Sequence, residues 1–266
     1  MSRLAVIGAG VMGETLMAGL LRAGWAPDQI TAVDRHAPRL AELTARYGIA
    51  TASLADATAQ ADAVVVVVKP QDTAEVLPQV AASLRPGALV VSLCAGVTTG
   101  QIEAVMPDGT PVVRVMPNTP AQVDEGMAAI SGGSTATTAN LEFVTGLLEA
   151  VGKVVVVPEK YQDAVTAISG SGPAYLFFVV EAMIDAGVML GLPRDIATTL
   201  VVQTMYGSAK LLSESGVHPT QLRERVTSPG GTTAAALREL EDHRVKAAFM
   251  TAMEAARDRS RELASS

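Results

Sequence analysis

The chain has 266 residues and a formal net charge of −7; 49% of its residues are hydrophobic and only 3% are aromatic. This length fits one large domain or two ordinary ones, with enough apolar residues for a sizeable core. The acidic balance and the lack of a basic run exclude a general binder of nucleic-acid backbones. The single cysteine, Cys94, cannot form an internal disulfide, and the N-terminal stretch is a poor signal peptide. We therefore expect a cytoplasmic protein.

Apolar runs and helical segments alternate along the chain as far as Val157. The valines at 64–68 are typical of a strand that is buried on both faces of a sheet. The alternation predicts an α/β fold, with a parallel sheet covered by helices on both faces. The expected strands are Leu4–Gly8, Ile30–Asp34, Ala63–Val68, Ala88–Leu93, Pro111–Met116 and Val151–Val157, and the expected helices are Val11–Ala23, Pro38–Tyr47 and Asp72–Leu84.

From Glu159 onward the pattern is helical, and no convincing strand follows. The change near Pro158–Tyr161 predicts one domain over residues 1–159 and an all-helical domain over residues 160–266. The expected helices are 161–169, 173–190, 193–214, 219–226 and 232–262.

The helical domain is small for the apolar surface that it carries, so we expect a second copy of the chain to cover that surface as a homodimer. Residues 173–193 are nearly long enough to span a bilayer, but Glu181 and Asp185 lie on one helical face near the middle. Unpaired carboxylates in hydrocarbon are costly, which favours a buried helix or a subunit interface over a membrane span. The apolar face includes Leu176, Phe177, Val180, Met183 and Ile184.

The first strand is followed by the glycine pattern Gly8-x-Gly10-x-x-Gly13 and then by a helix. In a dinucleotide-binding domain the first glycine makes a tight turn, the second lets the backbone approach a pyrophosphate, and the third lets the helix lie close to the sheet. Val11 and Met12 would then lie at the helix start, where N–H groups face the ligand. The alternative is a tight turn that binds nothing.

The second strand ends at Asp34, followed by Arg35 and His36. An acid at this position hydrogen-bonds the adenine ribose and favours NAD, whereas an arginine favours the 2′-phosphate of NADP. Arg35 and His36 could pair with that phosphate while Asp34 turns aside, or all three could belong to a solvated loop. The sequence leaves the cofactor preference open.

Three further strand ends carry residues that could face a cofactor, because ligands bind beyond the carboxyl ends of the strands in such sheets. Small residues in "CAGV" would let a nicotinamide ribose approach the backbone, and the asparagine of "MPNTP" offers a donor and an acceptor. The cysteine has no thiolate-stabilising pattern beside it, so it is interpreted as a small apolar residue. The candidates are Val68, Lys69, Pro70, Cys94, Ala95, Gly96 and Asn118.

Two helix starts in the second half could bind an anion, because a helix start presents unpaired N–H groups and partial positive charge. In "ISGSGPAYLFF" Pro173 fits the first helical position, with Ser171 or Gly172 as the cap. In "SPGGTTAAAL" a flexible turn precedes a helix that Thr232 or Thr233 can cap. Ordinary helix capping is the alternative for both. The residues are Ser171, Gly172, Ser228, Gly230, Gly231, Thr232 and Thr233; the three histidines share no metal-ligand spacing, so no metal is expected.

Together these motifs resemble the pyrroline-5-carboxylate reductase family over nearly the whole chain. The most specific stretches are "AISGSGPAYLFFVVEAMIDAGV" at 167–188 and "HPTQLRERVTSPGGTT" at 218–233. The glycine fingerprint, "VVKP" at 67–70, "CAGV" at 94–97 and "RVMPNTP" at 114–120 agree with them.

The resemblance implies a Rossmann-type dinucleotide-binding domain, a helical dimerisation domain, and an active site formed between subunits of dimers that assemble into larger rings, a decamer among them. It implies reduction of a five-membered cyclic imine, 1-pyrroline-5-carboxylate, to L-proline with NADPH, or NADH as the alternative donor. The loop Ser228–Thr233 would hold the substrate carboxylate, and Thr233 would lie near the imine nitrogen. The acid Asp34 beside Arg35 departs from the polar-arginine pair that the family commonly carries.

Two other functions remain open from the sequence. A hydroxyacid dehydrogenase would have a similar plan and would use a catalytic lysine after the first domain, where Lys160 stands in an expected loop. A non-enzymatic dinucleotide sensor would bind the cofactor without turnover.

Overall fold

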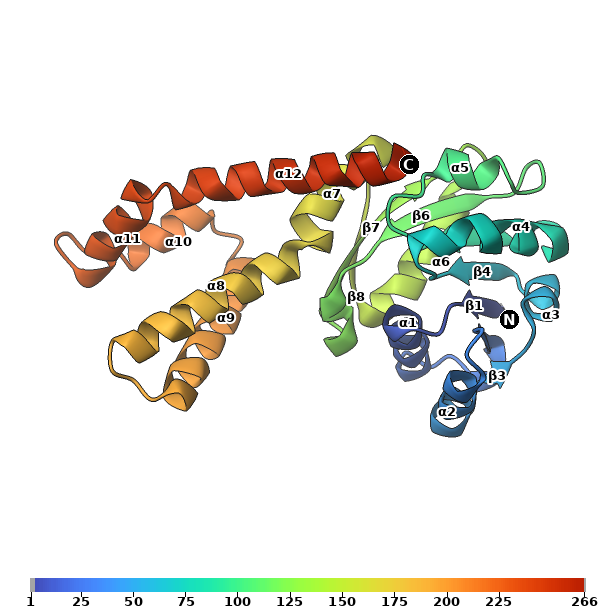
Figure 1. Ribbon diagram of the computed structural model, residues 1–266, viewed down its shortest axis with the longest axis horizontal. Coiled ribbons are helices and arrows are strands. Elements are labelled where there is room, and N and C mark those ends of the chain that lie inside the picture. The colour runs from blue at the N-terminus through green and yellow to red at the C-terminus, as the bar shows by residue number, and fades with distance from the viewer. Residues whose placement is uncertain (1–2, 266) are drawn as a thin grey trace. The chain divides into compact units, whose positions relative to one another are not determined.

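Short, apolar segments form one sheet of eight strands in the order β3-β2-β1-β4-β5-β6-β7-β8 (Figure 1). The structure, a computed structural model, describes residues 3–265. Every predicted strand is present, in slightly shorter form. The strands are β1 Leu4–Ile7, β2 Ile30–Val33, β3 Ala50–Thr51, β4 Ala63–Val66, β5 Leu89–Ser92, β6 Val112–Met116, β7 Gly126–Gly132 and β8 Gly152–Val156.

Strands β1 to β6 are mutually parallel, and the direction reverses between β6 and β7, where Val113 lies opposite Gly132 and Met116 opposite Ala129. The expectation of a fully parallel sheet was therefore wrong for β7 and β8. β7 was not predicted because its sequence, "GMAAISG", consists mostly of small residues with low strand propensity. β8 pairs in parallel with β7, so it also runs opposite to the first six strands, and it forms the edge of the sheet.

Two apolar cores lie on the two faces of the sheet, as the period of two in a strand requires. In β1, Leu4 and Val6 belong to one core, while Ala5 and Ile7 belong to the other. Helices α1, α2 and α6 contribute to the first core, and α3, α4 and α5 to the second. These helices are α1 Val11–Arg22, α2 Ala37–Tyr47, α3 Leu54–Gln60, α4 Thr73–Ser83, α5 Thr99–Glu103 and α6 Thr138–Leu148.

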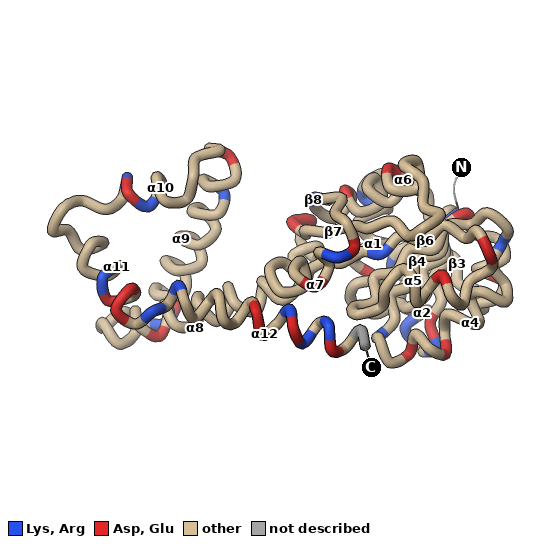
Figure 2. Tube along the Cα trace, turned by 90° about the horizontal axis from the view of Figure 1, so that it is seen from above, with Lys and Arg blue, Asp and Glu red and all other residues tan. Residues whose placement is uncertain are grey.

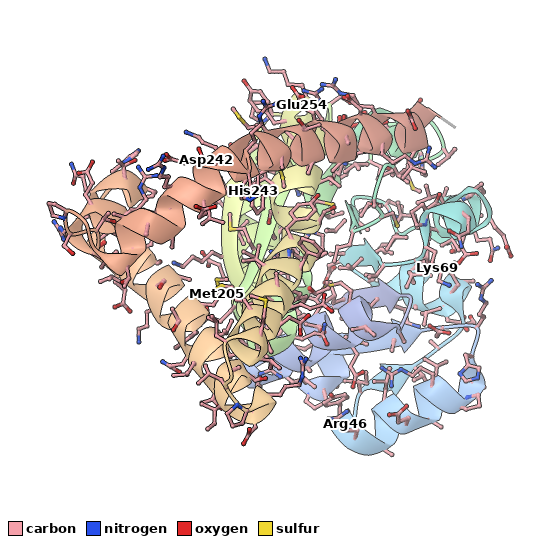
Figure 3. All side chains as sticks on the ribbon, turned by 60° about the vertical axis from the view of Figure 1, so that its left-hand side comes forward. Arg46, Lys69, Met205, Asp242, His243 and Glu254 are labelled. Carbon is pink, nitrogen blue, oxygen red and sulfur yellow. The ribbon has the colours of Figure 1, made fainter. Side chains whose placement is uncertain are left out.

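The rest of the chain is helical in the residues that the structure describes. The expected helix at 232–262 is in fact two helices, because the chain turns at Arg244, which has a left-handed φ of 56°. His243, labelled in Figure 3, ends the first of them. These helices are α7 Gln162–Val165, α8 Gly172–Met189, α9 Arg194–Ser215, α10 Pro219–Arg225, α11 Thr232–Asp242 and α12 Val245–Ser265.

Internal contacts divide the chain into two compact units. The first comprises the chain up to Ser171 and the chain from Ala256 onward, and the second is Gly172–Ala255. In the second unit α8 packs against α9 where Gly187 approaches Ala197. The predicted boundary after residue 159 separates two functions, whereas these units are defined by contacts within the chain. The functional boundary therefore stays a prediction.

Charges are mixed over both units. Figure 2 shows Lys and Arg interspersed with Asp and Glu, with no continuous basic tract among the residues that it colours. α8, by contrast, is strongly apolar and has only Pro173 buried within the single chain. Phe177 and Phe178 are 67% and 71% exposed there. Apolar surface of this size is typical of a subunit interface.

Candidate active site

A cavity of about 450 Å³ opens at the carboxyl ends of β1, β2 and β4. The strand order reverses between β1 and β4, and this switch point is where open α/β sheets bind dinucleotides. This volume is large enough for one nucleotide half of a dinucleotide cofactor. Of the predicted cofactor residues, the lining includes Gly8, Gly10, Asp34, Arg35, Val68 and Lys69.

Steric demands explain two of the three glycines in the fingerprint. Gly8 has φ +105°, and a Cβ there would lie 2.4 Å from the carbonyl oxygen of Val67. A Cβ on Gly13 would lie 2.1 Å from the carbonyl oxygen of Gly8. Gly10, in contrast, has nothing within 4 Å of a Cβ position. Gly10 is therefore not required by the protein's own packing, which fits a position reserved for close approach of a ligand.

The start of α1 keeps its N–H groups available. Gly10 is the N-cap and supplies no side-chain hydrogen bond, so the first-turn donors of Val11 and Met12 lack that partner. Val11 is 63% exposed, although it is apolar. A helix of 12 residues with an open start beside a glycine turn suits the negative charge of a pyrophosphate.

Asp34 is bound to the glycine turn. Its Oδ2 accepts a hydrogen bond from the backbone N–H of Ala9 at 2.8 Å, and its Oδ1 accepts one from the N–H of His36 at 2.9 Å. Arg39 donates from Nε to the carbonyl oxygen of Ala9 at 3.0 Å. Both polar groups of the Ala9 residue are thus held by side chains from the end of β2 and from α2. This arrangement matches the alternative in which Asp34 turns aside from the ribose.

Arg35 remains at the surface of the same cavity. Its side chain is 78% exposed and forms an ion pair with Asp72 at 3.2 Å. Lys69, labelled in Figure 3, follows β4 and also lines the cavity. His36 is the N-cap of α2, and Pro70 begins a short 3₁₀ turn; neither belongs to the cavity lining.

Glu14 joins α1 to α2 next to this turn. It accepts hydrogen bonds from Arg39, from Arg46 at 3.1 Å and from the Tyr47 hydroxyl at 2.9 Å. Burial works to raise the pKa of Glu14, but the hydrogen bonds from Arg39 and Tyr47 and the nearby guanidinium charges outweigh it. The pKa of Glu14 therefore lies below its ordinary value. The network fixes the helix that presents the open N–H groups.

The turn after β5 places small residues at its tip. Ala95 is exposed, and Gly96 has a φ of 76° that suits glycine. Cys94 is buried, and its thiol donates to the carbonyl oxygen of Val68 at 3.4 Å. Burial raises the pKa of the Cys94 thiol. This environment agrees with the interpretation of Cys94 as a small apolar residue.

Asn118 uses its amide within the protein. Nδ2 donates to the carbonyl oxygen and to the hydroxyl of Ser169, both at 3.3 Å, and Oδ1 accepts from the N–H of Met127 at 2.8 Å. Asn118 lies outside the lining of the large cavity. Its contacts attach the segment before Ser171 to the end of β6.

The segment before Ser171 is a π-helix, Thr166–Gly170. The N–H of Ser171 donates to the carbonyl oxygen of Thr166 at 2.8 Å, which is the i→i+5 bond of that conformation. π-helical turns occur frequently at functional sites. Helix α8 begins at Gly172, so Pro173 is its second residue, and the prediction that Pro173 is the first was wrong by one position.

The other predicted substrate loop forms a tight turn in the second unit. The N–H of Gly231 donates to the carbonyl oxygen of Ser228 at 3.0 Å, and Gly230 has a φ of 69°. The prediction of a threonine cap was wrong, because Gly231 is the N-cap of α11 and no side chain caps it. Thr232 is the first helical residue. The first-turn N–H groups of α11 therefore lack a capping side chain.

Comparison with known proteins agrees with this geometry over the whole length of the chain. A family model for pyrroline-5-carboxylate reductase dimerisation matches residues 159–263, and a model for NADP oxidoreductase, coenzyme F420-dependent, matches residues 3–96. The pyrroline-5-carboxylate reductase of Corynebacterium melassecola is 45% identical over 267 residues, which is 99% of both chains. The chain belongs to the pyrroline-5-carboxylate reductase family.

Solved structures of the family have the same fold. The pyrroline-5-carboxylate reductase of Coxiella burnetii superposes with a TM-score of 0.94 at 35% identity and 98% coverage of both chains. The NADP-bound pyrroline carboxylate reductase of Plasmodium falciparum superposes with a TM-score of 0.89 at 30% identity, covering 99% of this chain and 98% of that one. The Rossmann-type domain and helical C-terminal region predicted from the sequence are confirmed.

Membership of this family also bears on the apolar helix. The stretch Glu159–Met189 is long and apolar enough to cross a membrane, judged by length and composition alone. Only 6% of its most apolar window is buried inside the single chain, so most of its apolar surface is uncovered there. The stretch lies entirely within the region that the dimerisation model matches. A subunit interface in this region would cover that apolar surface. Among the described residues, no group of three or more potential ligands could hold a metal ion.

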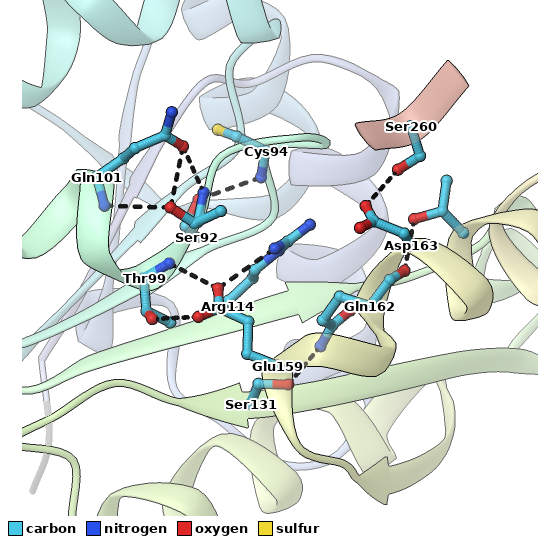
Figure 4. Close-up of polar contacts among 12 residues, drawn as sticks. Ser92, Cys94, Thr99, Gln101, Arg114, Ser131, Glu159, Gln162, Asp163 and Ser260 are labelled. Atoms are coloured by element: carbon cyan, nitrogen blue, oxygen red, sulfur yellow. Dashed lines mark hydrogen bonds and ion pairs between the residues drawn. The ribbon is translucent and has the colours of Figure 1, made fainter. Parts of the chain in front are cut away.

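One polar cluster in this reductase was not predicted from the sequence. Arg114 on β6 is 4% exposed and donates to Glu159 at 3.3 Å, while Glu159 accepts two hydrogen bonds from Thr99 at the start of α5 (Figure 4). The sequence feature that could have predicted this cluster is the arginine in the apolar strand "VVRVM", because a charge buried in a sheet requires a partner. The partner is 45 residues away, and its position could not be derived from spacing.

Proposed function

We propose that this chain reduces 1-pyrroline-5-carboxylate to L-proline, the last step of proline biosynthesis, with NADPH or NADH as the hydride donor. The observation that carries the proposal is the switch-point cavity with its open helix start, in a chain that aligns from end to end with pyrroline-5-carboxylate reductases. When bound, the reduced nicotinamide supplies the hydride that adds to the imine carbon. The following roles of individual residues are part of the proposal.

The glycine turn and the start of α1 bind the pyrophosphate. Gly10 leaves room for close approach, and the N–H groups of Val11, Met12 and Gly13 supply donors. Arg35 and His36 lie at the end of β2, where a 2′-phosphate is recognised. Lys69, with Val68 and Pro70, lies at the neighbouring strand end. The turn Cys94–Gly96 and Asn118 complete the nicotinamide side.

The turn before α11 holds the substrate carboxylate. Gly230 and Gly231 leave its backbone bare, and the uncapped N–H groups of the first turn, with Ser228 and Thr232 beside them, provide donors. A carboxylate at a helix start gains roughly 0.3–2 kcal/mol from the dipole, depending on burial. Direct N–H bonds add to this. Ser171 and Gly172, at the start of α8, contribute the second substrate segment.

Thr233 hydrogen-bonds the imine nitrogen, directly or through a water. A protonated imine accepts hydride more readily, and such a substrate can arrive protonated near neutral pH. The protein therefore needs no strong acid, and most of the rate gain comes from holding the reacting groups in place.

The dimerisation region supports a homo-oligomer that acts on a small molecule. We assign cofactor binding to residues 1–159, and substrate binding and dimerisation to residues 160–266. A decamer assembled from dimers, a cytoplasmic location, and the lack of membrane or nucleic-acid association belong to the same proposal. Ultracentrifugation at micromolar concentration tests the assembly, and a monomer would contradict it.

The direct test is oxidation of NADPH and NADH in parallel with pyrroline-5-carboxylate as substrate. We expect turnover with at least one cofactor and proline as the product. Folded protein that binds the cofactor but leaves the imine unreduced would support a dinucleotide sensor. Activity on a 3-hydroxy acid instead would support a hydroxyacid dehydrogenase.

A further inference from the structure

Glu159 holds together three segments that are far apart in the sequence. Its Oε1 accepts from the N–H of Thr99 at 2.7 Å and from Nη1 of Arg114 at 3.3 Å, and its Oε2 accepts from the hydroxyl of Thr99 at 2.6 Å (Figure 4). Thr99 and Arg114 are buried. A carboxylate with two short hydrogen bonds to one residue fixes that residue in distance and in orientation.

One end of this contact is the loop Cys94–Thr98. The loop begins at a buried position, where the N–H of Cys94 donates to the Ser92 hydroxyl at 3.3 Å. It ends at Thr99, which Glu159 holds. Between these anchors Ala95 is exposed at the tip of the turn. The position of the tip therefore depends on both anchors.

The other end is the segment that leads to Ser171. Three residues after Glu159, Gln162 is fully buried and donates to the Ser131 hydroxyl at 2.8 Å. Further along, Asn118 donates to Ser169. The segment is thus fixed to the sheet at several points, and Glu159 is the point that joins it to the loop Cys94–Thr98.

We propose that the Glu159–Thr99 contact is a positioning element for hydride transfer. It holds the nicotinamide-side loop in a fixed place relative to the segment that leads into the substrate-binding helix start. The inference rests on the proposed function. Neither residue lines the cavity at the strand ends, and the proposed roles give neither of them a contact with the substrate or the cofactor. The contact therefore acts through the loop and changes the rate of the chemical step more than it changes cofactor binding.

The pairing with Arg114 decides which variants are informative. Nη2 of Arg114 is buried and has no hydrogen-bond partner among residues 3–265, so Glu159 is the group that balances this charge. Removing the carboxylate would leave a buried charge uncompensated, which commonly disrupts folding. Thr99 is the better site, because Thr99→Val keeps the size of the side chain and removes only the hydroxyl hydrogen bond.

The experiment compares Thr99→Val with Thr99→Ser in the full-length enzyme, with Glu159→Gln as a second probe. Thr135→Val is the matched control, since its hydroxyl also donates a single hydrogen bond, to the carbonyl oxygen of Thr110 at 2.7 Å. For each variant, kcat, the dissociation constant for NADPH, the melting temperature and the isotope effect with C4-deuterated cofactor are measured.

We expect Thr99→Val to lower kcat by about tenfold and to raise the deuterium isotope effect, because small misplacements of reacting groups are costly. The dissociation constant for NADPH should stay within about twofold of the wild-type value. Thr99→Ser and Thr135→Val should keep wild-type kcat. A Thr99→Val enzyme with wild-type kcat would overturn the proposal, as would a loss of rate fully matched by loss of folded protein. A wild-type enzyme without turnover would refute the proposed function instead.

Discussion

The carboxylate of Asp34 accepts a hydrogen bond from the backbone N–H of Ala9 at 2.8 Å. An acid that the glycine pattern would assign to the ribose is therefore engaged in fixing the turn that carries the pattern. His36 donates its N–H to the other carboxylate oxygen. The acid at the end of β2 thus supports the shape of the binding loop for either cofactor.

Replacing Asp34 should weaken the binding of NADPH and of NADH to a similar degree. In Asp34→Ala the N–H of Ala9 loses its partner, and we expect the dissociation constants for NADPH and NADH to rise together by about tenfold. Arg35→Gln is the contrasting variant, because it should weaken NADPH and leave NADH nearly unchanged. Fluorescence titration of both cofactors measures this. A selective loss of NADH binding in Asp34→Ala would show instead that the carboxylate hydrogen-bonds the adenine ribose.

Alanine at two of the glycines should separate folding from binding. A Cβ on Gly13 meets the carbonyl oxygen of Gly8 at 2.1 Å, so Gly13→Ala should lower the melting temperature markedly. A Cβ on Gly10 meets nothing within 4 Å, so Gly10→Ala should keep wild-type stability and lose cofactor affinity. Thermal melts with and without NADPH distinguish the two effects. Unchanged cofactor affinity in Gly10→Ala would place the pyrophosphate elsewhere.

Glu14 should make part of the stability dependent on pH. Its folded pKa is lowered from an ordinary 4.5, so its contribution is complete above that value and is lost as the pH falls through the folded pKa. We expect Glu14→Gln to cost about 1 kcal/mol of unfolding free energy at neutral pH. The difference from wild type should shrink below about pH 4. Urea titrations of both proteins at neutral pH and below about pH 4 measure this difference in unfolding free energy.

The matched variant for this test is Glu42→Gln, whose carboxylate also pairs with Arg39 but is 57% exposed. It should cost much less, because exposed ion pairs contribute little. Equal losses for the two variants, or a Glu14→Gln loss that is the same at both pH values, would contradict the assignment.

Thr233→Ala should slow the enzyme without inactivating it. Losing one hydrogen bond to the imine nitrogen corresponds to about a tenfold drop in turnover, since the substrate can bring its own proton. Thr198→Ala is the control, because its hydroxyl donates to the backbone carbonyl oxygen of Arg194 and, among residues 3–265, to no other group. Steady-state kinetics measure both. Complete loss of activity in folded Thr233→Ala would require an acid role, and unchanged kinetics would remove Thr233 from the mechanism.

The sequence predicted the elements whose pattern is strong. The valine run of β4 and the glycine turn after β1 were found because burial and steric demands leave a direct trace in residue type. β7 and the end of α11 were not, since small residues such as those of "GMAAISG" have no strong preference and Arg244 carries no glycine or proline signal.

The candidate site was predictable only in part for a related reason. The positions of Gly10 and Arg35 at the cavity could be predicted because they follow from local order along the chain, while their roles in binding stay a prediction. Asp34 and Asn118 form hydrogen bonds within the protein, and Arg114 pairs with Glu159. All of these contacts join segments that are distant in the sequence. A single sequence contains the partners but not their pairing.

In the proposed reaction a hydride passes from a reduced nicotinamide to the imine carbon of pyrroline-5-carboxylate. The most direct measurement uses cofactor deuterated at the transferable C4 position, with mass spectrometry of the proline formed. We expect proline that carries deuterium on the ring carbon that was the imine carbon. Proline without deuterium, or no proline from folded, cofactor-bound protein, would contradict it.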